Sequence, residues 1–256
     1  MAKLSILNIK VDKTTKERVL KKVEEWISKK RKKRELPKYI VTPNPEIALK
    51  AYKDPELAKI INKADIAISD GIGFKMVADT DLTVIKGREL VLDILTLANR
   101  SKKRIYFLGG KSIVNKAAVE KAKIEFPNIS IKGSAGAIVN KKGEGIDKKN
   151  IDIDKKTLTV INRFGPDVLF VALGAPKQEY WIGKNIEKLN ARVIMAVGGS
   201  LDYYTGVVKL PPAIMATFGL EWAWRLFNEP VRFERILNAV VVFPVQFILH
   251  KIKVNF

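Results

Sequence analysis

Residues 167–182 read DVLFVALGAPKQEYWI, and the architecture of the chain can be built outward from them. The stretch opens with a continuous apolar run that ends at Gly174. An apolar run without polar alternation predicts a strand covered on both faces, as in a parallel sheet. A polar segment follows at once, and Pro176 suits the first turn of a helix. The stretch therefore predicts a buried strand that passes through a glycine turn directly into a helix.

The same alternation of apolar runs and helical patterns recurs along the chain. Strands are predicted at 4–9, 39–42, 65–69, 104–109, 128–133, 167–173 and 192–197. Helices are predicted between them at 14–29, 45–62, 71–79, 89–100, 112–125, 155–164 and 176–189. This order predicts an α/β fold, a Rossmann-like open and mostly parallel sheet with helices on both faces. The charged residues 140–156 predict an exposed loop.

The composition narrows the chemistry of the 256-residue chain. It contains no cysteine, which excludes disulfides and thiolate metal sites. Its single histidine, His250, excludes a multi-histidine metal site and argues against a Ser-His-Asp triad. The net charge of +20 indicates either anionic partners, such as lipid, phosphorylated ligands or nucleic acid, or simply a lysine-rich surface.

The composition changes after Gly206, which predicts two parts: a core at 1–206 and an appendage at 207–256. The appendage is rich in aromatic residues and arginines, and it predicts amphipathic helices broken at Pro230 and Pro244. Its most apolar run, 236–249, is shorter than the roughly 20 residues that span a bilayer. The aromatics either dip into a lipid interface or pack on the core or on another copy of the chain.

Ligands of an open parallel sheet bind beyond the carboxyl ends of its strands, so the residues after each strand are candidates. Small residues there let the backbone approach a ligand, and helix N-termini offer N–H groups to phosphate. The substrate-binding candidates from these turns are Gly109, Gly136, Ala137, Gly174, Lys177, Glu179, Gly199 and Asp202. Together they predict a pyrophosphate site, although Glu179 could instead only stabilise the first turn of its helix.

Asp70 differs from these small residues because it ends a buried strand and precedes Gly71. A carboxylate at that place could act as a general base in a cleft. It could equally cap the helix predicted at 71–79. Position alone leaves the two roles open.

The shorter motifs are only weak evidence for a nucleotide-binding or metal-binding site. GGKS at 109–112 lacks the earlier glycine of a P-loop, and no complete GxGxxG occurs. The acidic pairs of DTD at 79–81 and DID at 152–154 could hold a metal ion, but neither closes a predicted strand. We expect both to be solvated acidic residues.

Seven stretches occur in order between about residues 39 and 236: TPNPEI, DGIG, KGREL, FLGG, VLFVALGAPKQEYWI, VGGSLDYYTG and LEWAWRLFNEPVRF. On these motifs the chain resembles the WecG/TagA/CpsF family of glycosyltransferases. The resemblance implies transfer of N-acetylmannosamine from a UDP-sugar to a polyprenyl-diphosphate-linked sugar, in cell-surface polysaccharide or teichoic acid synthesis. Transfer of glucose, galactose or N-acetylmannosaminuronate is the alternative. The family reaction is implied to be inverting and to need neither metal nor cofactor.

The resemblance also implies roles for individual residues. Asp70 matches the catalytic base, Thr42 and Asn44 match cleft residues, and Gln178 matches a glutamine near the reacting sugar. Asp202 matches an acidic residue that contacts the nucleoside. The arginines of the appendage, which match basic residues over the active site, are Arg225, Arg232 and Arg235.

Two departures from the family pattern bear on the donor. Relatives carry an arginine where this chain has Val84, and Lys86 or Arg88 is the candidate replacement. Where this chain has Ala137, relatives carry an aromatic side chain for the uracil base of the donor.

The resemblance places the protein on the cytoplasmic face of the membrane, as a peripheral protein on an anionic leaflet. A homo-oligomer is compatible with the sequence. Two rival classes are a non-catalytic nucleotide-sugar-binding module and a nucleic-acid-binding protein. The second rests on charge alone, because basic residues do not cluster with aromatics in the α/β part.

Overall fold

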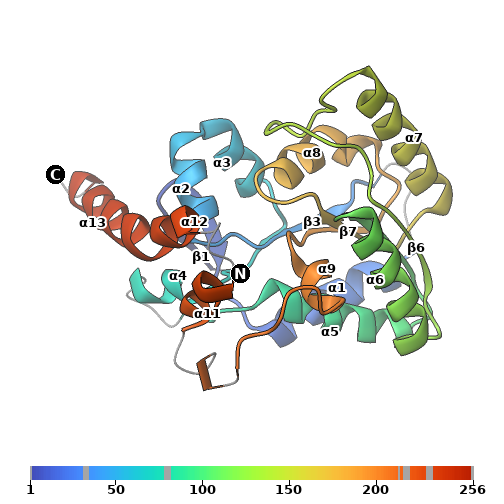
Figure 1. Cartoon of the computed structure of the whole chain (residues 1–256), viewed down its shortest axis with the longest axis horizontal. Coiled ribbons are helices and arrows are strands. Elements are labelled where there is room, and N and C mark those ends of the chain that lie inside the picture. Colours follow the sequence, from blue (N-terminus) through green and yellow to red (C-terminus); the bar gives the residue numbers. More distant parts are fainter. Residues whose placement is uncertain are drawn as a thin grey trace.

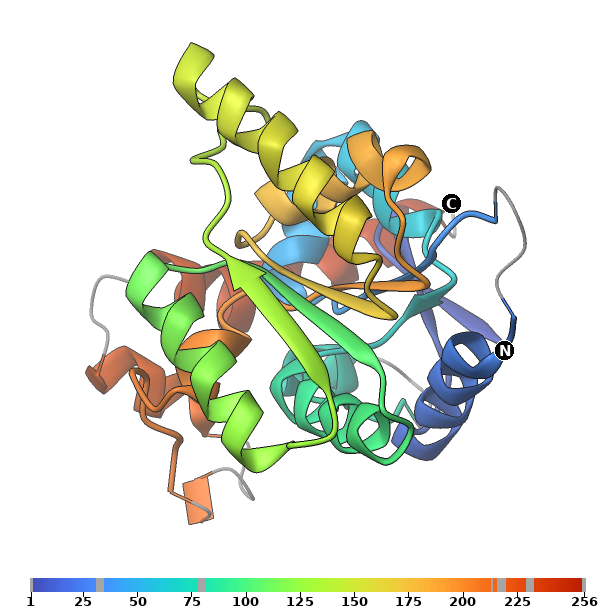
Figure 2. The same ribbon diagram turned by 90° about the vertical axis from the view of Figure 1, so that its right-hand side faces the viewer.

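The computed structural model describes most of the chain, as residues 2–30, 35–77, 82–212, 214–215, 220–228 and 233–254. The predicted Rossmann-like sheet is confirmed (Figures 1 and 2). Its strands are β3 (Lys38–Val41), β4 (Ile66–Ala67), β5 (Arg104–Gly109), β6 (Ser130–Ser134), β7 (Val168–Ala172) and β8 (Val193–Ala196). They lie in the order β4-β3-β8-β7-β5-β6, and all neighbours are parallel.

Helices cover both faces of this sheet because successive strand residues point to opposite sides. Leu169 and Val171 of β7 face one core cluster, whereas Val168 and Phe170 face the other. The first cluster lies under α2 (Pro45–Lys53), α3 (Pro55–Asn62), α7 (Lys148–Phe164) and α8 (Lys177–Asn185). The second lies under α1 (Lys16–Ser28), α5 (Gly87–Arg100), α6 (Ser112–Glu125) and α9 (Ser200–Tyr204). Short elements complete the core, α4 (Ile72–Val77) and the 3-10 turn η1 (Ile186–Lys188).

The strand predicted at 4–9 is not part of the large sheet. Residues Lys3–Ile6 and Ile9–Asp12 form a separate antiparallel hairpin, β1 and β2, turning at Leu7 with φ of 52°. The carboxylate of Asp12 accepts a hydrogen bond from the Ala67 N–H at 2.8 Å, which fastens the hairpin beside β4.

The helix predicted at 45–62 is interrupted at Asp54. The residue before a proline disfavours the helical region, and Asp54 is extended (φ −129°, ψ 93°) ahead of Pro55. Its carboxylate then caps α3 by accepting from the Leu57 N–H at 3.2 Å.

The exposed loop predicted at 140–156 is wrong in its second half, because α7 already begins at Lys148. Asp147 caps this helix by accepting from the Asn150 N–H at 2.8 Å. A narrow buried stripe suffices to hold the helix, so its charged composition concealed it. Of the acidic pair in DID, Asp152 is exposed as expected. Asp154 is half-buried, however, and accepts a hydrogen bond from Trp181 Nε1 at 2.7 Å.

The chain after Gly206 forms α11 (Glu221–Asn228), α12 (Phe233–Leu237), the π-helical turn η3 (Asn238–Val242) and α13 (Phe243–Val254). The expected break at Pro244 does not occur. The preceding π turn, in which the Phe243 N–H bonds to the Asn238 carbonyl, accommodates the proline inside one continuous helix. By length and composition alone, Phe233–Ile252 is long and apolar enough to cross a bilayer, contrary to the sequence-based expectation.

One face of this C-terminal helix packs on the core, beside α2 and α4 (Figure 1). Phe243 is fully buried and its ring lies 5.4 Å from that of Phe74. His250 meets Tyr52 edge-on at 5.5 Å. The helix is therefore docked through specific aromatic contacts.

We predict that Phe243→Ala weakens the docking of the C-terminal helix by about 3 kcal/mol, the usual cost of truncating a buried phenylalanine. Hydrogen exchange of amides within 243–254 should accelerate. The matched control is Phe233→Ala, because Phe233 is 58% exposed and its loss should leave exchange unchanged. Equal protection in both variants would contradict the prediction.

Candidate active site

A pocket of about 320 Å³ opens at the carboxyl ends of β3, β4, β7 and β8. Nine of the residues singled out from the sequence line it: Thr42, Asn44, Asp70, Arg88, Gly174, Gln178, Gly199, Asp202 and Arg235. They come from separate segments of the chain, and parallel strands bring their ends to one edge.

Thr42 and Asn44 are fixed where β3 passes into α2. The hydroxyl of Thr42 donates to the Ala196 carbonyl at 3.3 Å, which ties the end of β3 to that of β8. Asn44 caps α2 through Oδ1, which accepts from the Ile47 N–H at 3.0 Å. The amide nitrogen of Asn44 is then left on the side chain as a hydrogen-bond donor.

Asp70 follows β4, and its backbone N–H donates to the Pro43 carbonyl at 2.9 Å. A Cβ built on Gly87 would lie 3.5 Å from Asp70 Oδ2 and 3.4 Å from Thr42 Oγ1. The carboxylate and the hydroxyl therefore converge on Gly87 at the start of α5.

Arg88 supplies a guanidinium to the pocket, stacked 5.4 Å from the centre of the Tyr203 ring. It donates two hydrogen bonds of 3.1 Å to the carboxylate of Glu221 in α11. Lys86 pairs with the same carboxylate at 2.5 Å and does not line the pocket. Burial would raise the pKa of Glu221, but the bonds from Arg88 and Lys86 outweigh it and lower that pKa. Of the two candidate replacements for the arginine missing at Val84, Arg88 is the one that lines the pocket.

Arg235, from α12, also lines the pocket. Its guanidinium bonds to Glu46 Oε2 through Nε at 2.9 Å, and Lys50 bonds to the other oxygen of Glu46 at 2.6 Å. Burial raises the pKa of Glu46, and the two cations more than reverse the effect. The C-terminal segments are thus tied to the pocket at two points, by Glu221 and by Arg235.

Two glycines of the pocket present bare backbone to it. Gly174 and Gly198 have positive φ values, 79° and 52°, which favour glycine. Apart from the adjoining residues of the chain, no atom of the described residues lies within 4 Å of where their Cβ atoms would be. At Gly109 and Gly136 protein atoms fill that direction instead, Ala172 at 2.6 Å and Leu108 at 2.8 Å. The first pair leaves room for a ligand against the backbone, whereas the second pair serves packing.

Gln178 joins the loops that follow β7 and β8. Its backbone N–H donates to the Gly174 carbonyl at 3.0 Å, and its Oε1 accepts from the Gly198 N–H at 2.9 Å. The side chain is nearly buried, and it lines the pocket at the base of α8. The peptide bond before Pro176, at the start of this helix, is cis.

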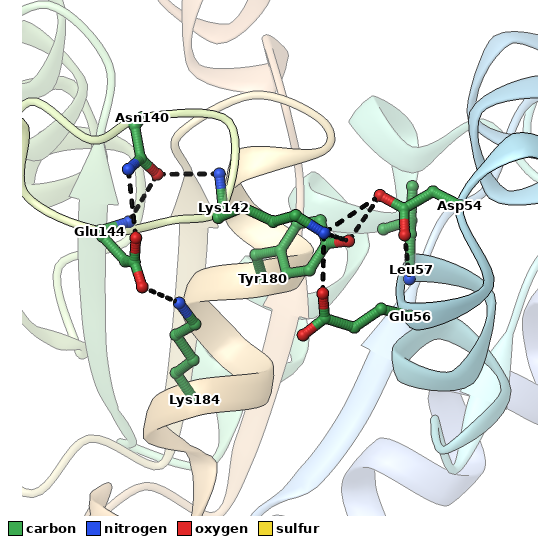
Figure 3. A network of polar contacts seen from close by, with 8 residues as sticks. All are labelled: Asp54, Glu56, Leu57, Asn140, Lys142, Glu144, Tyr180 and Lys184. Carbon is green, nitrogen blue, oxygen red and sulfur yellow. Dashed lines mark hydrogen bonds and ion pairs between the residues drawn. The ribbon is translucent and has the colours of Figure 1, made fainter.

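The helix that carries Gln178 is held from outside by a network of polar contacts (Figure 3). Lys142, on the loop after β6, bonds to the Tyr180 hydroxyl at 2.6 Å and to Glu56 of α3 at 2.7 Å. The hydroxyl of Tyr180 donates in turn to Asp54 at 2.6 Å. The bond to Glu56, followed by that to Tyr180, raises the pKa of Lys142. The network fixes α8 relative to α3 and so keeps the site end of α8 in place.

Five residues predicted as substrate contacts lie outside the lining of the pocket: Gly109, Gly136, Ala137, Lys177 and Glu179. Ala137 is buried in the core, and Glu179 is fully buried beneath Gln178. The strand order explains the first three, because β5 and β6 lie on the far side of β7 from β3 and β8. Chain order alone does not reveal which strand ends are neighbours.

The other predicted residues lie wholly or partly outside the part of the chain that the structure describes. Arg232 and the DTD residues 79–81 lie outside the described residues, as does Pro230, and Arg225 lies in α11 with its side chain undescribed. Within the described part of the chain, no group of three or more histidine, aspartate and glutamate side chains is placed to hold a metal ion.

The pocket also contains residues that the sequence reasoning missed: Ile47, Ala172, Leu173, Val197, Tyr203 and Val208. Ala175, Gly198 and Ser200, from the turns expected at the ligand edge, line it as well. Tyr203 is the aromatic among the missed residues, and it lies one residue after Asp202 in the motif GGSLDYYTG. Its position next to a predicted site residue was the signal in the sequence that an aromatic side chain lines the pocket.

The fold and the pocket define an α/β enzyme scaffold with its site at the sheet edge. Residues 4–255 match the family model described as Glycosyl transferase WecG/TagA/CpsF family, so the chain belongs to this family and the resemblance is confirmed. It is 34% identical over 204 residues to an N-acetylglucosaminyldiphosphoundecaprenol N-acetyl-beta-D-mannosaminyltransferase of Bacillus spizizenii, covering 78% of this chain and 75% of that protein. A Staphylococcus aureus protein of the same name is 29% identical over 249 residues, covering 94% and 91%.

We predict that Gly87→Ala lowers transferase turnover by tenfold or more while the melting temperature holds. The added methyl fits at van der Waals distance and improves helix propensity, but it lies against the Asp70 carboxylate and the Thr42 hydroxyl. Thermal denaturation and steady-state kinetics on the same samples test this. Unchanged turnover in the folded variant would show that the space at Gly87 is not used by substrate.

Proposed function

We propose that the protein transfers N-acetylmannosamine from UDP-N-acetylmannosamine to a polyprenyl-diphosphate-linked N-acetylglucosamine, in teichoic acid or related cell-surface polysaccharide synthesis. The observation that carries the proposal is one pocket that combines the carboxylate of Asp70 with the guanidiniums of Arg88 and Arg235. A single displacement that releases a nucleoside diphosphate needs a base for the attacking hydroxyl and positive charge for the departing phosphates, and these three side chains can provide both. The names of the relatives supply the sugar and the acceptor.

In this reaction Asp70 takes the proton from the attacking hydroxyl of the acceptor sugar. The hydroxyl oxygen forms a bond to the anomeric carbon of the donor while the bond from that carbon to the phosphate oxygen breaks. One attack from the opposite face inverts the anomeric configuration. A retaining route by double displacement would require a second, nucleophilic carboxylate.

The departing UDP gains negative charge, which the site must stabilise. Arg88 and Arg235 provide guanidiniums for this, and the bare backbone at Gly174 and Gly198 allows phosphate oxygens to approach N–H groups. Two of the five guanidinium hydrogens of Arg88 are bonded to Glu221, which holds its plane in a fixed orientation. We propose on this basis that the reaction proceeds without a metal ion.

We predict that Asp70→Asn lowers the turnover number at least 100-fold, because an amide cannot accept the proton. Release of UDP from UDP-N-acetylmannosamine is measured with a short-chain lipid-diphosphate acceptor, with and without EDTA. The wild type should keep its rate in EDTA. The control is Asp152→Asn, which changes an exposed aspartate far along the chain. Turnover of Asp70→Asn within a few-fold of wild type would exclude Asp70 as the base.

We further propose that the C-terminal helix lies in the plane of an anionic membrane, on the cytoplasmic face. Val241, Val245, Ile248 and Ile252 are about half exposed, and their spacing places them along one stripe. The opposite side of the helix is held on the core through the fully buried Phe243. A bilayer-spanning arrangement would have to withdraw Phe243 from that core. The net charge of +20 adds attraction to acidic lipids.

We predict that the double variant Val245→Asp/Ile248→Asp loses most of its binding to anionic vesicles, because each charge opposes burial in the interface. Co-sedimentation with phosphatidylglycerol vesicles measures the binding. The control is Ile113→Asp, which places the same charge at an even more exposed apolar residue, on α6. Release of the wild type from vesicles by high salt is expected of an in-plane helix. Retention of the double variant on the vesicles would contradict the proposal.

A further inference from the structure

Glu179 is a fully buried carboxylate that the reaction proposed above does not use. One oxygen, Oε1, accepts a hydrogen bond from Gln178 Nε2 at 2.9 Å. The other, Oε2, has no hydrogen-bond partner among the described residues, and the same holds for the buried hydroxyl of Tyr39. A buried charge without a matched partner is costly to stability, and such groups concentrate where function requires them.

The contacts on either side of Gln178 fix which way its amide points. The Gly198 N–H needs an acceptor, so the amide oxygen must face Gly198. The carboxylate of Glu179 also needs a donor, so the amide nitrogen must face Glu179. A flipped amide would set two donors against each other at Gly198 and two acceptors against each other at Glu179.

This forced orientation leaves one hydrogen on Gln178 Nε2 that is used by neither contact. Gln178 lines the pocket, between the bare backbone of Gly174 and that of Gly198. The remaining N–H of Gln178 can donate a hydrogen bond but cannot accept one. It therefore favours a substrate with an acceptor oxygen at this position, from the sugar or its acetamido group, and disfavours a substrate with a donor there.

We propose that Glu179 is a positioning residue, which fixes the Gln178 amide so that the pocket receives an N–H donor for an oxygen of the sugar substrate. The role of the donor rests on the proposed function, but the orientation of the amide does not. The same bonds hold the turn at Gly198 in place, so Glu179 acts on two walls of the pocket without touching substrate.

Titration of Glu179 gives the arrangement a pH dependence. Burial raises the pKa of Glu179 to about 7, against the lowering effects of Gln178, the local backbone and Lys50 of α2. Burial and then the charge of Glu179 raise the pKa of Tyr39, on β3, so Tyr39 stays neutral. Because the folded protein holds this proton more tightly than the unfolded chain, stability falls as the pH rises from about 4.5 to 7.

The test compares Glu179→Met with the wild type and with Glu187→Met, the same change at an exposed glutamate just beyond α8. Methionine is close to glutamate in length and volume, and it removes both the buried charge and the oxygen that accepts from Gln178 Nε2. We expect Glu179→Met to lower kcat/KM about tenfold, the scale of one lost positioned hydrogen bond. Its melting temperature should exceed that of the wild type at pH 8, with the difference shrinking towards pH 5.

Two further measurements separate positioning from a purely structural role. In a Gln178→Ala background, Glu179→Met should cause no additional loss of kcat/KM, because the residue through which it acts is gone. In NMR spectra, the side-chain amide protons of Gln178 should titrate with a midpoint near pH 7 in the wild type and not in Glu179→Met.

The outcomes distinguish the two proposals. Wild-type kcat/KM in Glu179→Met, additive losses in the double variant, or a Gln178 amide that does not titrate would each overturn the positioning role. Absence of sugar transfer by the wild type would overturn the proposed function instead. In that case the amide titration still decides whether Glu179 orients Gln178.

Discussion

The site depends on the parallel ladder that joins β3, β8 and β7. Backbone pairing sets Ile40 beside Met195 and Val171 beside Ala196, so the three strands end at the same edge. Their following residues, Thr42, Gly198 and Gly174, then share one pocket although they are far apart in the sequence. Two bonds beyond the ladder hold these ends together, from Thr42 to the Ala196 carbonyl and from the Gly198 N–H to Gln178. A shift in register would separate the walls of the pocket.

The C-terminal segments complete this edge and do not merely follow the core. Glu221 binds Arg88, and Arg235 binds Glu46, so two charged contacts connect these segments to the pocket. Phe243 adds an apolar anchor in the core beside Phe74. A pocket whose arginines come partly from a segment with an apolar outer face suits a substrate with a charged head and a lipid tail. Acceptor chemistry and surface attachment would then depend on the same docked helix.

Much of this arrangement follows from local pattern. The continuous apolar run at Val168–Ala172 and its neighbours predicted the buried strands, and the segments between them predicted most helices. Predictions from local pattern were wrong where the structure of a segment depends on contacts with residues distant in the sequence. The charged composition of α7 hid a helix held by a narrow stripe, and Leu7 divides an apparent strand into a hairpin. Pro244 predicted a break that a π turn absorbs.

The sequence by itself determined the α/β class, the family and most residues at the strand ends, because burial patterns and turn residues are local properties. Only the tertiary structure decided which of those ends meet. Gly174 and Gly198 face open space, whereas Gly109 and Gly136 face packed atoms, and nothing in the residue type distinguishes them. Glu179 was predicted to contact substrate or to stabilise a first helical turn, yet it is fully buried and bonds to Gln178. The reason is that strand order and side-chain direction arise from contacts between distant segments.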